Sequence, residues 1–464
     1  MSNSPSSGNG AYAALVTELR EHFNAGLTRD LAWRREQLNA LIALLDDNAP
    51  AIDAALRDDL AKPAHETLLG ELTLLYSETR HALSRLKKWT RIRRVHTPAF
   101  AQPGRSWVQP EPLGVVLIIG AWNYPVQLSL APLIPALAAG NTAIIKPSEM
   151  APASSKLIAE LAPKYFDARA VRVVEGGKDE TSALLQERFD HIVYTGGGRV
   201  GRIVMKAAAE HLTPVTLELG GKSPAVVDDS ADVASAARRI IWGKCINAGQ
   251  TCIAPDYVLV SREQHDALIA AMETSLQAMF GDDRLHSADY CRIINADHFQ
   301  RLKGLLGEGK VAIGGGSDEA TQRIEPTVLT DITVNAPVMQ EEIFGPILPI
   351  IAVDDIEAAI RTIKQGDKPL AAYVFARDRQ VQQRFVDEVS CGSLCINDTL
   401  MFMSVPDLPF GGVGPSGMGQ YHGQAGFDRL SHLKAVMRRG RFPEIPVRFA
   451  PYTPFKTRLL RWLA

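Results

Sequence analysis

Apolar side chains recur three and four positions apart through residues 11–93, among many charges, as in LAWRREQLNALIALLDDNAPAIDAAL. This spacing predicts helices that bury one stripe and expose the rest. From residue 113 the pattern changes to short apolar runs that alternate with helical stretches. The runs expected to form strands are GVVLII, TAIIK, AVRVVEG, HIVYTG, VTLELGG and SPAVVDD. Strands joined by crossover helices predict an α/β fold with a doubly wound, Rossmann-like sheet that is mostly parallel.

The same alternation resumes after Cys252 and predicts a second α/β domain. Its expected elements are YVLVS, an amphipathic stretch at 263–280, RIEPTVLTD, ILPIIAV, a helix near 355–365 and AAYVFA. Between residues 97 and 112 the segment TPAFAQPGRSWVQPEP has proline near both ends. Such a segment is typical of a linker or an exposed hairpin.

One stretch, from Leu113 to Ile145, has no charged side chain and is long enough to cross a bilayer as a helix. Helix-breaking residues within this stretch argue against a spanning helix, because they would leave backbone groups without hydrogen-bond partners in lipid. The residues concerned are Gly120, Asn123, Pro125, Pro132, Pro135, Gly140 and Asn141. We therefore expect a buried strand, a loop, a short buried helix and a second strand.

Composition narrows the class of partner. The 464 residues include 50 Lys plus Arg and 52 Asp plus Glu, for a formal charge of −2, so no strong field attracts nucleic acid. A small-molecule partner is favoured. Five scattered cysteines do not form a disulfide framework, which favours a reducing compartment. The polar first ten residues are not followed by a basic and then apolar signal segment, so we expect a cytoplasmic protein.

Cys252 lies in the turn-prone stretch NAGQTCIAPD. A thiol of ordinary pKa is only a few per cent ionised at neutral pH, so a nucleophilic cysteine needs help from nearby N–H groups. Gly249 allows the backbone to approach closely, and the amides of this turn could serve the sulfur or an oxyanion. Taken alone, a cysteine such as Cys252 is more often an ordinary buried residue than a nucleophile.

Glu218 lies at the end of the apolar run in VTLELGGKSP, and Leu219 separates it from the two glycines. This position predicts the carboxyl edge of a parallel sheet, where open α/β folds bind their ligands. Partial desolvation would raise the carboxyl pKa toward neutrality, and Glu218 could then take a proton from water or from the thiol. The alternative is a solvated carboxylate at a strand end.

Asn123 follows a predicted buried strand in GAWNYP. An amide donor near a reacting carbonyl can stabilise negative charge by about 3 kcal/mol, although Asn before Tyr-Pro is also a simple turn residue. The aromatic residues Trp122, Tyr124 and Trp242 are candidates for an apolar substrate wall, with core packing as the alternative.

Seven ordered stretches carry a resemblance to the NAD(P)-dependent aldehyde dehydrogenase superfamily. They are WNYP, IIKPSE, YTGGGRVG, LELGGKSP, GQTC, EEIFGP and PFGGVGPSGMG. The match runs from about residue 11 to about residue 440, and the short N-terminal part together with HLTPVTLELGGKSP and GQTCIAPDYVLV is most similar to the class 3 branch. The resemblance implies oxidation of medium-chain aliphatic or aromatic aldehydes to carboxylic acids, commonly by a homodimer.

The resemblance also assigns roles to the three candidate residues. It implies that Cys252 is the nucleophile that forms a thiohemiacetal and then a thioester, Glu218 the general base and Asn123 an oxyanion donor. These roles agree with the interpretation of each residue by itself. No metal is implied, and Cys391 and Cys395 are expected to be packing residues.

For the cofactor, the resemblance implies NAD, with NADP as an alternative. Lys146 and Glu149 would meet the adenosine ribose, and Glu342 and Phe344 the nicotinamide ribose and ring. The pyrophosphate would lie by the loop with Gly196, Gly197 and Gly201.

That loop departs from its family, because Gly197 and Gly198 stand where many members carry Ser or Asn and then Thr. We expect a flexible loop, modest cofactor affinity and loose selection between NAD and NADP. Glu149 should repel a 2′-phosphate and so favour NAD.

The predicted organisation is a cofactor-binding domain, a catalytic domain and a small bridging or oligomerisation element. The expected ranges are 1–96 and 113–216 for the first, 217–400 for the second, and 97–112 with 401–464 for the hairpin and C-terminal tail.

Two other functions remain open. A coenzyme A acceptor in place of water would make an acylating dehydrogenase, but that branch commonly lacks the glutamate that Glu218 supplies. A non-catalytic, structural use of the fold is disfavoured by the intact Cys252, Glu218 and Asn123.

The last segment, 434–464, has eight Lys or Arg and one acidic residue. It could touch anionic lipid as a peripheral membrane contact, but packing on a partner subunit is favoured.

Overall fold

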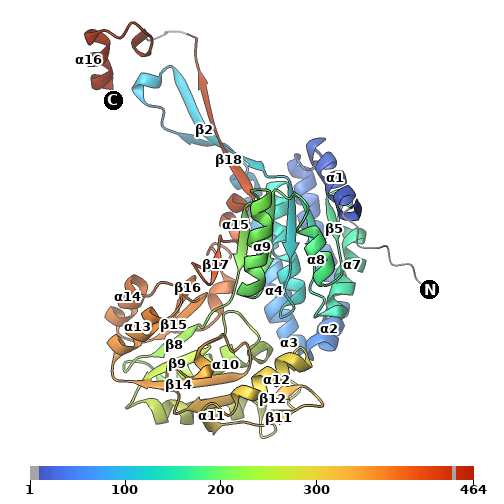
Figure 1. The fold of residues 1–464 in the computed structure, drawn as a ribbon, viewed down its shortest axis with the longest axis vertical. Coiled ribbons are helices and arrows are strands. Elements are labelled where there is room, and N and C mark those ends of the chain that lie inside the picture. The colour runs from blue at the N-terminus through green and yellow to red at the C-terminus, as the bar shows by residue number, and fades with distance from the viewer. Residues whose placement is uncertain (1–9, 442–445, 464) are drawn as a thin grey trace, which may run out of the picture.

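The computed structural model describes residues 10–441 and 446–463. Six strands form the first sheet, and five of them are parallel, as predicted (Figure 1). In spatial order they are β17 (Gly417–Met418), β7 (Val215–Glu218), β6 (His191–Thr195), β3 (Val115–Ile119), β4 (Thr142–Lys146) and β5 (Val171–Val173). The edge strand β17 is antiparallel to β7.

Both faces of this sheet are covered by helices, which explains its uninterrupted apolar runs. In β3, Val115, Leu117 and Ile119 face one hydrophobic cluster, and Val116 and Ile118 face another. The first cluster includes side chains of α1 (Gly10–Asn24), α8 (Lys178–Leu184) and α9 (Gly198–Glu210). The second includes side chains of α2 (Leu31–Leu60), α4 (Thr73–Trp89), α5 (Pro125–Leu130), α6 (Leu133–Ala139) and α7 (Pro152–Tyr165).

The expected helical region 11–93 is helical as far as Trp89, with α3 (Ala64–Thr67) and the π-helical segment η1 (Leu68–Leu72) between α2 and α4, whereas Arg93 already begins a strand. The chargeless stretch from Leu113 to Ile145 forms β3, α5, α6 and most of β4, all inside the fold. Among the described residues, no helix has the length and apolar character needed to cross a membrane.

Seven strands form the second sheet, in the lower lobe of Figure 1. Their order is β10 (Lys310–Ile313), β13 (Thr327–Thr330), β14 (Ile347–Val353), β9 (Tyr257–Ser261), β8 (Pro224–Val227), β15 (Ala371–Phe375) and β16 (Ser393–Ile396). All neighbours are parallel except β10 with β13. The predicted second α/β unit is therefore present.

Helices again cover both faces of this sheet. One side holds α10 (Val233–Cys245), α11 (His265–Phe280) and α12 (Ala296–Leu305), and the other α13 (Ile356–Gln365) and α14 (Arg379–Glu388). The short remaining elements are η3 (Ile246–Gly249), β11 (Ser317–Asp318), β12 (Arg323–Ile324), η4 (Pro337–Met339), η5 (Met401–Ser404) and α15 (Gly423–Arg429).

A third sheet extends away from both lobes as an arm (Figure 1). It consists of β1 (Arg93–Val95), β2 (Gly104–Pro112) and β18 (Ser431–Arg439), with η2 (Ala99–Ala101) in the β1–β2 connection. Of the two alternatives for 97–112, the hairpin is correct, because β2 pairs antiparallel with β1 and with β18. Beyond β18 lie η6 (Pro446–Arg448) and α16 (Pro454–Leu463).

The expected domain division stays a prediction. Its boundary between residues 216 and 217 falls inside β7, because all four residues of that strand belong to the first sheet. In addition, β17 from the predicted C-terminal element pairs with β7. Hydrogen bonding between strands distant in sequence therefore crosses the expected limits.

Candidate active site

Cys252 lies on a buried turn between η3 and β9. Before it, Asn247 and Ala248 have φ values of +53° and +51°, a left-handed conformation that the surrounding contacts must hold. After it, the carbonyl of Ile253 accepts a hydrogen bond from the Tyr373 hydroxyl at 2.5 Å. The backbone is therefore held in place both before and after the cysteine.

The environment of Cys252 keeps its thiol protonated in the absence of a partner. Burial is the main reason that the pKa of the thiol is raised, and the Glu342 and Glu218 carboxyls add to the shift. The main-chain N–H groups of Cys252 and Ile253 lower the pKa, as expected for donors that face the sulfur. A base close to the thiol is therefore needed to form the thiolate.

Glu218 is the last residue of β7 and is only 2% exposed. Neither of its carboxylate oxygens has a hydrogen-bond partner among residues 10–441 and 446–463. Burial raises the pKa of this carboxyl well above its usual range. An unpaired buried carboxylate costs free energy, so its retention beside a cysteine is typical of a functional proton acceptor.

Asn123 lies in the loop between β3 and α5 and is 3% exposed. Its side-chain Nδ2 donates to the carbonyl of Gln250 at 3.0 Å, two residues before Cys252. The fold therefore brings Asn123, Glu218 and Cys252 from three separate segments to one place. Their individual roles stay predictions.

The three aromatic candidates lie in different surroundings. The Trp122 ring contacts Phe344 edge-on at 5.3 Å and His298 at 5.1 Å between centroids. The Tyr124 hydroxyl is hydrogen-bonded to the Thr251 hydroxyl at 2.8 Å, so this tyrosine adjoins the cysteine turn. Trp242 packs from α10 against the main hydrophobic core.

The glycine loop joins β6 to α9, as expected for a phosphate-binding turn. Gly196 has a φ of +154°, and a Cβ there would collide with the Tyr194 hydroxyl. A Cβ on Gly197 would meet nothing within 4 Å, and a Cβ on Gly201 would lie 2.8 Å from Leu219 Cδ2. A side chain would therefore fit at position 197 but would clash at positions 196 and 201.

A cleft of about 530 Å³ begins at this loop. Its lining includes Gly198, Arg202, Gly220, Gly221 and Glu342. The size and the glycine-rich wall suit part of a dinucleotide. Phe344, which follows Glu342 closely in the chain, has a φ of +50° and faces Trp122.

Glu342 offers a buried acceptor in this cleft. Its Oε1 has no hydrogen-bond partner among the described residues, and burial, followed by the nearby Asp256, raises its pKa to about 8. An unpartnered carboxyl oxygen at the edge of a cleft fits a ligand hydroxyl.

Lys146 ends β4 at the same carboxyl edge of the first sheet as Glu218, and its side chain is 2% exposed. Its Nζ donates to the Pro147 carbonyl at 2.7 Å and to Glu149 Oε2 at 2.9 Å. The Glu149 side chain is about half exposed, at 51%. An exposed carboxylate held by a buried lysine is compatible with the predicted ribose contact.

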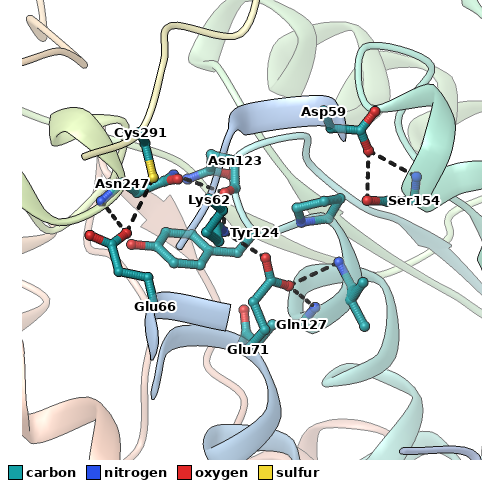
Figure 2. A network of polar contacts seen from close by, with 12 residues as sticks. Asp59, Lys62, Glu66, Glu71, Asn123, Tyr124, Gln127, Ser154, Asn247 and Cys291 are labelled. Atoms are coloured by element: carbon teal, nitrogen blue, oxygen red, sulfur yellow. Dashed lines mark hydrogen bonds and ion pairs between the residues drawn. The ribbon is translucent and has the colours of Figure 1, made fainter. Parts of the chain in front are cut away.

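Several residues near this site are not marked by any of the motifs described above. The Tyr421 hydroxyl is affected by the charges of both Glu218 and Cys252, which raise its pKa further after burial. A second group surrounds the Asn123 loop and is shown in Figure 2, namely Lys62, Glu66, Glu71, Asn247 and Cys291. In the sequence, Lys62 and Glu71 are two charges in a helical region, compatible with a solvated face, and Pro63 and Gly70 are the local irregularities between them.

No cluster of three or more His, Cys, Asp or Glu side chains that could hold a metal occurs in the described part of the chain.

Comparison with known proteins finds relatives and solved structures that are similar to nearly the whole chain. A family model described as "Aldehyde dehydrogenase family" matches residues 3–436. Arabidopsis thaliana aldehyde dehydrogenase family 3 member H1 is 46% identical over 461 residues, covering 98% of this chain and 95% of the relative. The rat protein named "Aldehyde dehydrogenase, dimeric NADP-preferring" is 45% identical, covering 93% and 98%. A substrate-bound structure of Staphylococcus aureus AldH has a TM-score of 0.94 and 43% identity, covering 97% and 98%.

Proposed function

This chain belongs to the aldehyde dehydrogenase family, and we propose that it oxidises medium-chain aliphatic or aromatic aldehydes to carboxylic acids through a thioester on Cys252. The observation that carries the mechanism is the buried, unpartnered carboxyl of Glu218 beside the Cys252 thiol. Asn123 reaches the same turn through its bond to Gln250. These contacts support the roles of Cys252 as nucleophile, Glu218 as base and Asn123 as oxyanion donor.

In the first step Cys252 adds to the carbonyl carbon of the aldehyde. Glu218, whose raised pKa makes its ionised carboxylate a stronger base than an exposed one, removes the thiol proton. The C–S bond forms and the carbonyl π electrons move to oxygen. Asn123 Nδ2 carries two N–H groups, of which one bonds Gln250, and the other is available to the oxyanion together with the Cys252 main-chain N–H.

The residues of the cleft fit NAD, with NADP as an alternative. The amides at the start of α9 would hold the pyrophosphate, Lys146 and Glu149 the adenosine ribose, and Glu342 the nicotinamide ribose. Phe344 would support the nicotinamide ring, since its own ring is fixed against Trp122. When bound, this cofactor accepts the hydride from the carbonyl carbon, which leaves a thioester on Cys252.

Before the last step Glu218 releases the thiol proton to solvent. It then removes a proton from water as the water oxygen attacks the thioester carbon, and it afterwards returns this proton to the Cys252 sulfur. The C–S bond breaks, the Cys252 sulfur leaves with its electron pair, and the carboxylic acid is released. Glu218 must be ionised for this step. Because burial raises its pKa, the rate of hydrolysis should increase with pH.

The test follows cofactor reduction for aldehydes from acetaldehyde to decanal and for benzaldehyde. Cys252→Ser should lose at least about 10³-fold in rate, because an alcohol is a poorer nucleophile at neutral pH. Cys391→Ser, a partly buried cysteine elsewhere, is the matched control. Equal losses in both variants, or none in Cys252→Ser, would disprove the assignment.

Glu218→Gln separates the two half-reactions. We expect the burst of reduced cofactor to form more slowly, because the thiol lacks its base. Steady turnover should fall about 100-fold, because hydrolysis of the thioester lacks its base. The pH dependence of the slow phase should disappear. A variant that keeps wild-type steady turnover would exclude Glu218 as the base for water.

The acceptor distinguishes the proposal from a coenzyme A-dependent reaction. Glu218 adjoins Cys252 and has no other partner among the described residues, which favours water as the acceptor. Acid should therefore form without coenzyme A. A dependence of turnover on added coenzyme A would support the acylating alternative, and no cofactor reduction with any aldehyde would support a non-catalytic role.

We further propose a cytoplasmic homodimer. The dimeric relative from rat and the antiparallel arm of β1, β2 and β18 support the assembly, because an exposed arm can extend across a partner. Exposed Phe455 and Trp462 on α16 suit packing on that partner, although anionic lipid would also suit them. Light scattering measures the assembly, and co-sedimentation with anionic vesicles tests the lipid alternative.

A further inference from the structure

A fully buried ion pair lies beneath the loop that carries Asn123 (Figure 2). Lys62 Nζ and Glu71 Oε1 are 2.7 Å apart, and both side chains have no exposed surface. Removing two charges from water carries a penalty that their attraction often fails to offset. The contacts that the pair makes with other groups are therefore informative about why it is retained.

Two local backbone features place these charges together. Lys62 follows Ala61, which ends α2 with a left-handed φ of +51°. Glu71 lies on the π-helical segment η1, a rare conformation that is frequent near functional sites. Between them, a Cβ on Gly70 would lie only 2.9 Å from Tyr124 Cε1, so η1 passes close to the ring next to Asn123.

The remaining hydrogen bonds of the pair go to the Asn123 loop and to the first turn of α5. Lys62 Nζ donates to the Asn123 carbonyl at 3.2 Å. Glu71 Oε2 accepts from the main-chain amides of Val126 at 3.0 Å and Gln127 at 2.8 Å. Lys62 Nζ also lies 4.2 Å from the centroid of the Tyr124 ring. The pair thus holds the loop on both sides of Tyr124.

Other contacts connect this loop to the cysteine turn. Asn247 Nδ2 donates to the Asn123 carbonyl at 2.8 Å and to the Gln250 carbonyl at 3.1 Å. Glu66 Oε2 accepts from the Asn247 main-chain N–H at 2.8 Å, which supports its left-handed conformation. The Asn123 carbonyl therefore accepts hydrogen bonds from both Lys62 and Asn247. The Asn123 side chain points to the segment before Cys252.

We propose that Lys62 and Glu71 are positioning residues that hold the Asn123 side-chain amide where it meets the oxyanion formed on the Cys252 adduct. This inference rests on the proposed function. The pair itself does not reach the reacting atoms, since its bonds end at the Asn123 loop. Positioning errors of about 1 Å at such a donor can lower rates by about 100-fold.

A double-mutant cycle tests this coupling. Lys62→Met should lower kcat by about 10- to 100-fold with KM changed by less than about three-fold, because a transition-state contact is weakened. Asn123→Ala should lower kcat by about 10²- to 10³-fold. If Lys62 acts through Asn123, adding Lys62→Met to Asn123→Ala should cause a further loss of less than about three-fold.

A second readout separates positioning from general disruption. Alkylation of Cys252 by iodoacetamide passes through no oxyanion, so its rate should stay within about two-fold in Lys62→Met. Lys156→Met, which removes an exposed lysine on α7 that faces Glu160, is the matched control. Slowed alkylation in parallel with kcat, an unchanged kcat, or multiplicative losses in the double variant would each overturn the proposal.

Two further variants keep the test decisive if Lys62→Met does not fold. Glu71→Gln removes the negative charge and keeps the shape of the side chain. The double variant Lys62→Met with Glu71→Leu removes both charges together. Either should show the selective loss of kcat, and wild-type kcat in a folded form of either would overturn the proposal. Cys252→Ser is measured alongside, because its retained activity would instead disprove the proposed function.

Discussion

The α-carbon of Gly220 packs so closely against the carboxyl of Glu342 that a side chain at position 220 would overlap it. The two residues come from the end of the first sheet and from the segment before β14. Their contact closes one wall of the cleft and contributes to the burial of Glu342. This burial has a measurable consequence for stability.

We expect the free energy of unfolding of the cofactor-free enzyme to depend on pH through Glu342. The pKa is about 8 in the folded protein and near the ordinary 4.5 when unfolded. Between these values the native state holds a proton that the unfolded state has released, so stability is lost as pH rises. Glu342→Gln should remove this part of the pH dependence.

Urea unfolding of wild type and Glu342→Gln measures the effect at about pH 5 and about pH 8. The variant should gain about 1–3 kcal/mol relative to wild type across this interval. Glu341→Gln, at the exposed neighbouring position, controls for the lost negative charge. A constant difference between Glu342→Gln and wild type would show that Glu342 ionises alike in both states.

The glycine loop provides a matched pair of substitutions for cofactor affinity. Gly197→Ser should tighten NAD binding by about two- to five-fold, because the site is open and a serine hydroxyl can cap α9. Gly196→Ser should weaken binding by about ten-fold or more, because of its positive φ and the adjacent Tyr194 hydroxyl. Calorimetric titration with NAD gives both affinities. The opposite order would mean that cofactor contacts do not depend on this turn.

Glu149 should influence the choice between NAD and NADP. Its exposed carboxylate would face a 2′-phosphate, so Glu149→Gln should raise the ratio of kcat/KM for NADP over NAD by about five-fold. The effect should shrink at high salt. Glu160→Gln removes a similarly exposed carboxylate from α7 and should leave the ratio unchanged. Equal ratios in all three proteins would place the 2′-phosphate away from Glu149.

Gly70 tests the packing of η1 against Tyr124. Gly70→Ala should lower the free energy of unfolding by about 1–3 kcal/mol, because its methyl group would press on the Tyr124 ring. Gly304→Ala, on α12 with no atom within 4 Å of its Cβ, should stabilise by up to about 1 kcal/mol. Thermal and urea unfolding compare the two. Similar effects in both variants would mean that the ring moves aside freely.

Much of the fold could be predicted because strands that are buried on both faces of a sheet consist of uninterrupted apolar residues. The run VVLII of β3 is apolar throughout since helices cover both sides of its sheet. Cys252, Glu218 and Asn123 were recognisable because each stands at a turn or strand end within a family motif. The same reasoning resolved neither the hairpin of residues 97–112 nor the boundary that β7 crosses, since both depend on pairing with distant strands.

The chain's own pattern predicted the two mostly parallel sheets, because hydrophobic periodicity and turn residues act over a few positions. The resemblance to a family, carried by short motifs, singled out Cys252, Glu218 and Asn123 as the candidate catalytic residues. Tertiary structure alone decided that Lys62 and Glu71 are buried and bonded to the Asn123 loop. In sequence they are two charges on an amphipathic helical stretch, compatible with a solvated face. Their burial follows from the left-handed residue Ala61, the π-helical segment and a loop more than fifty residues away, a combination that local periodicity does not encode.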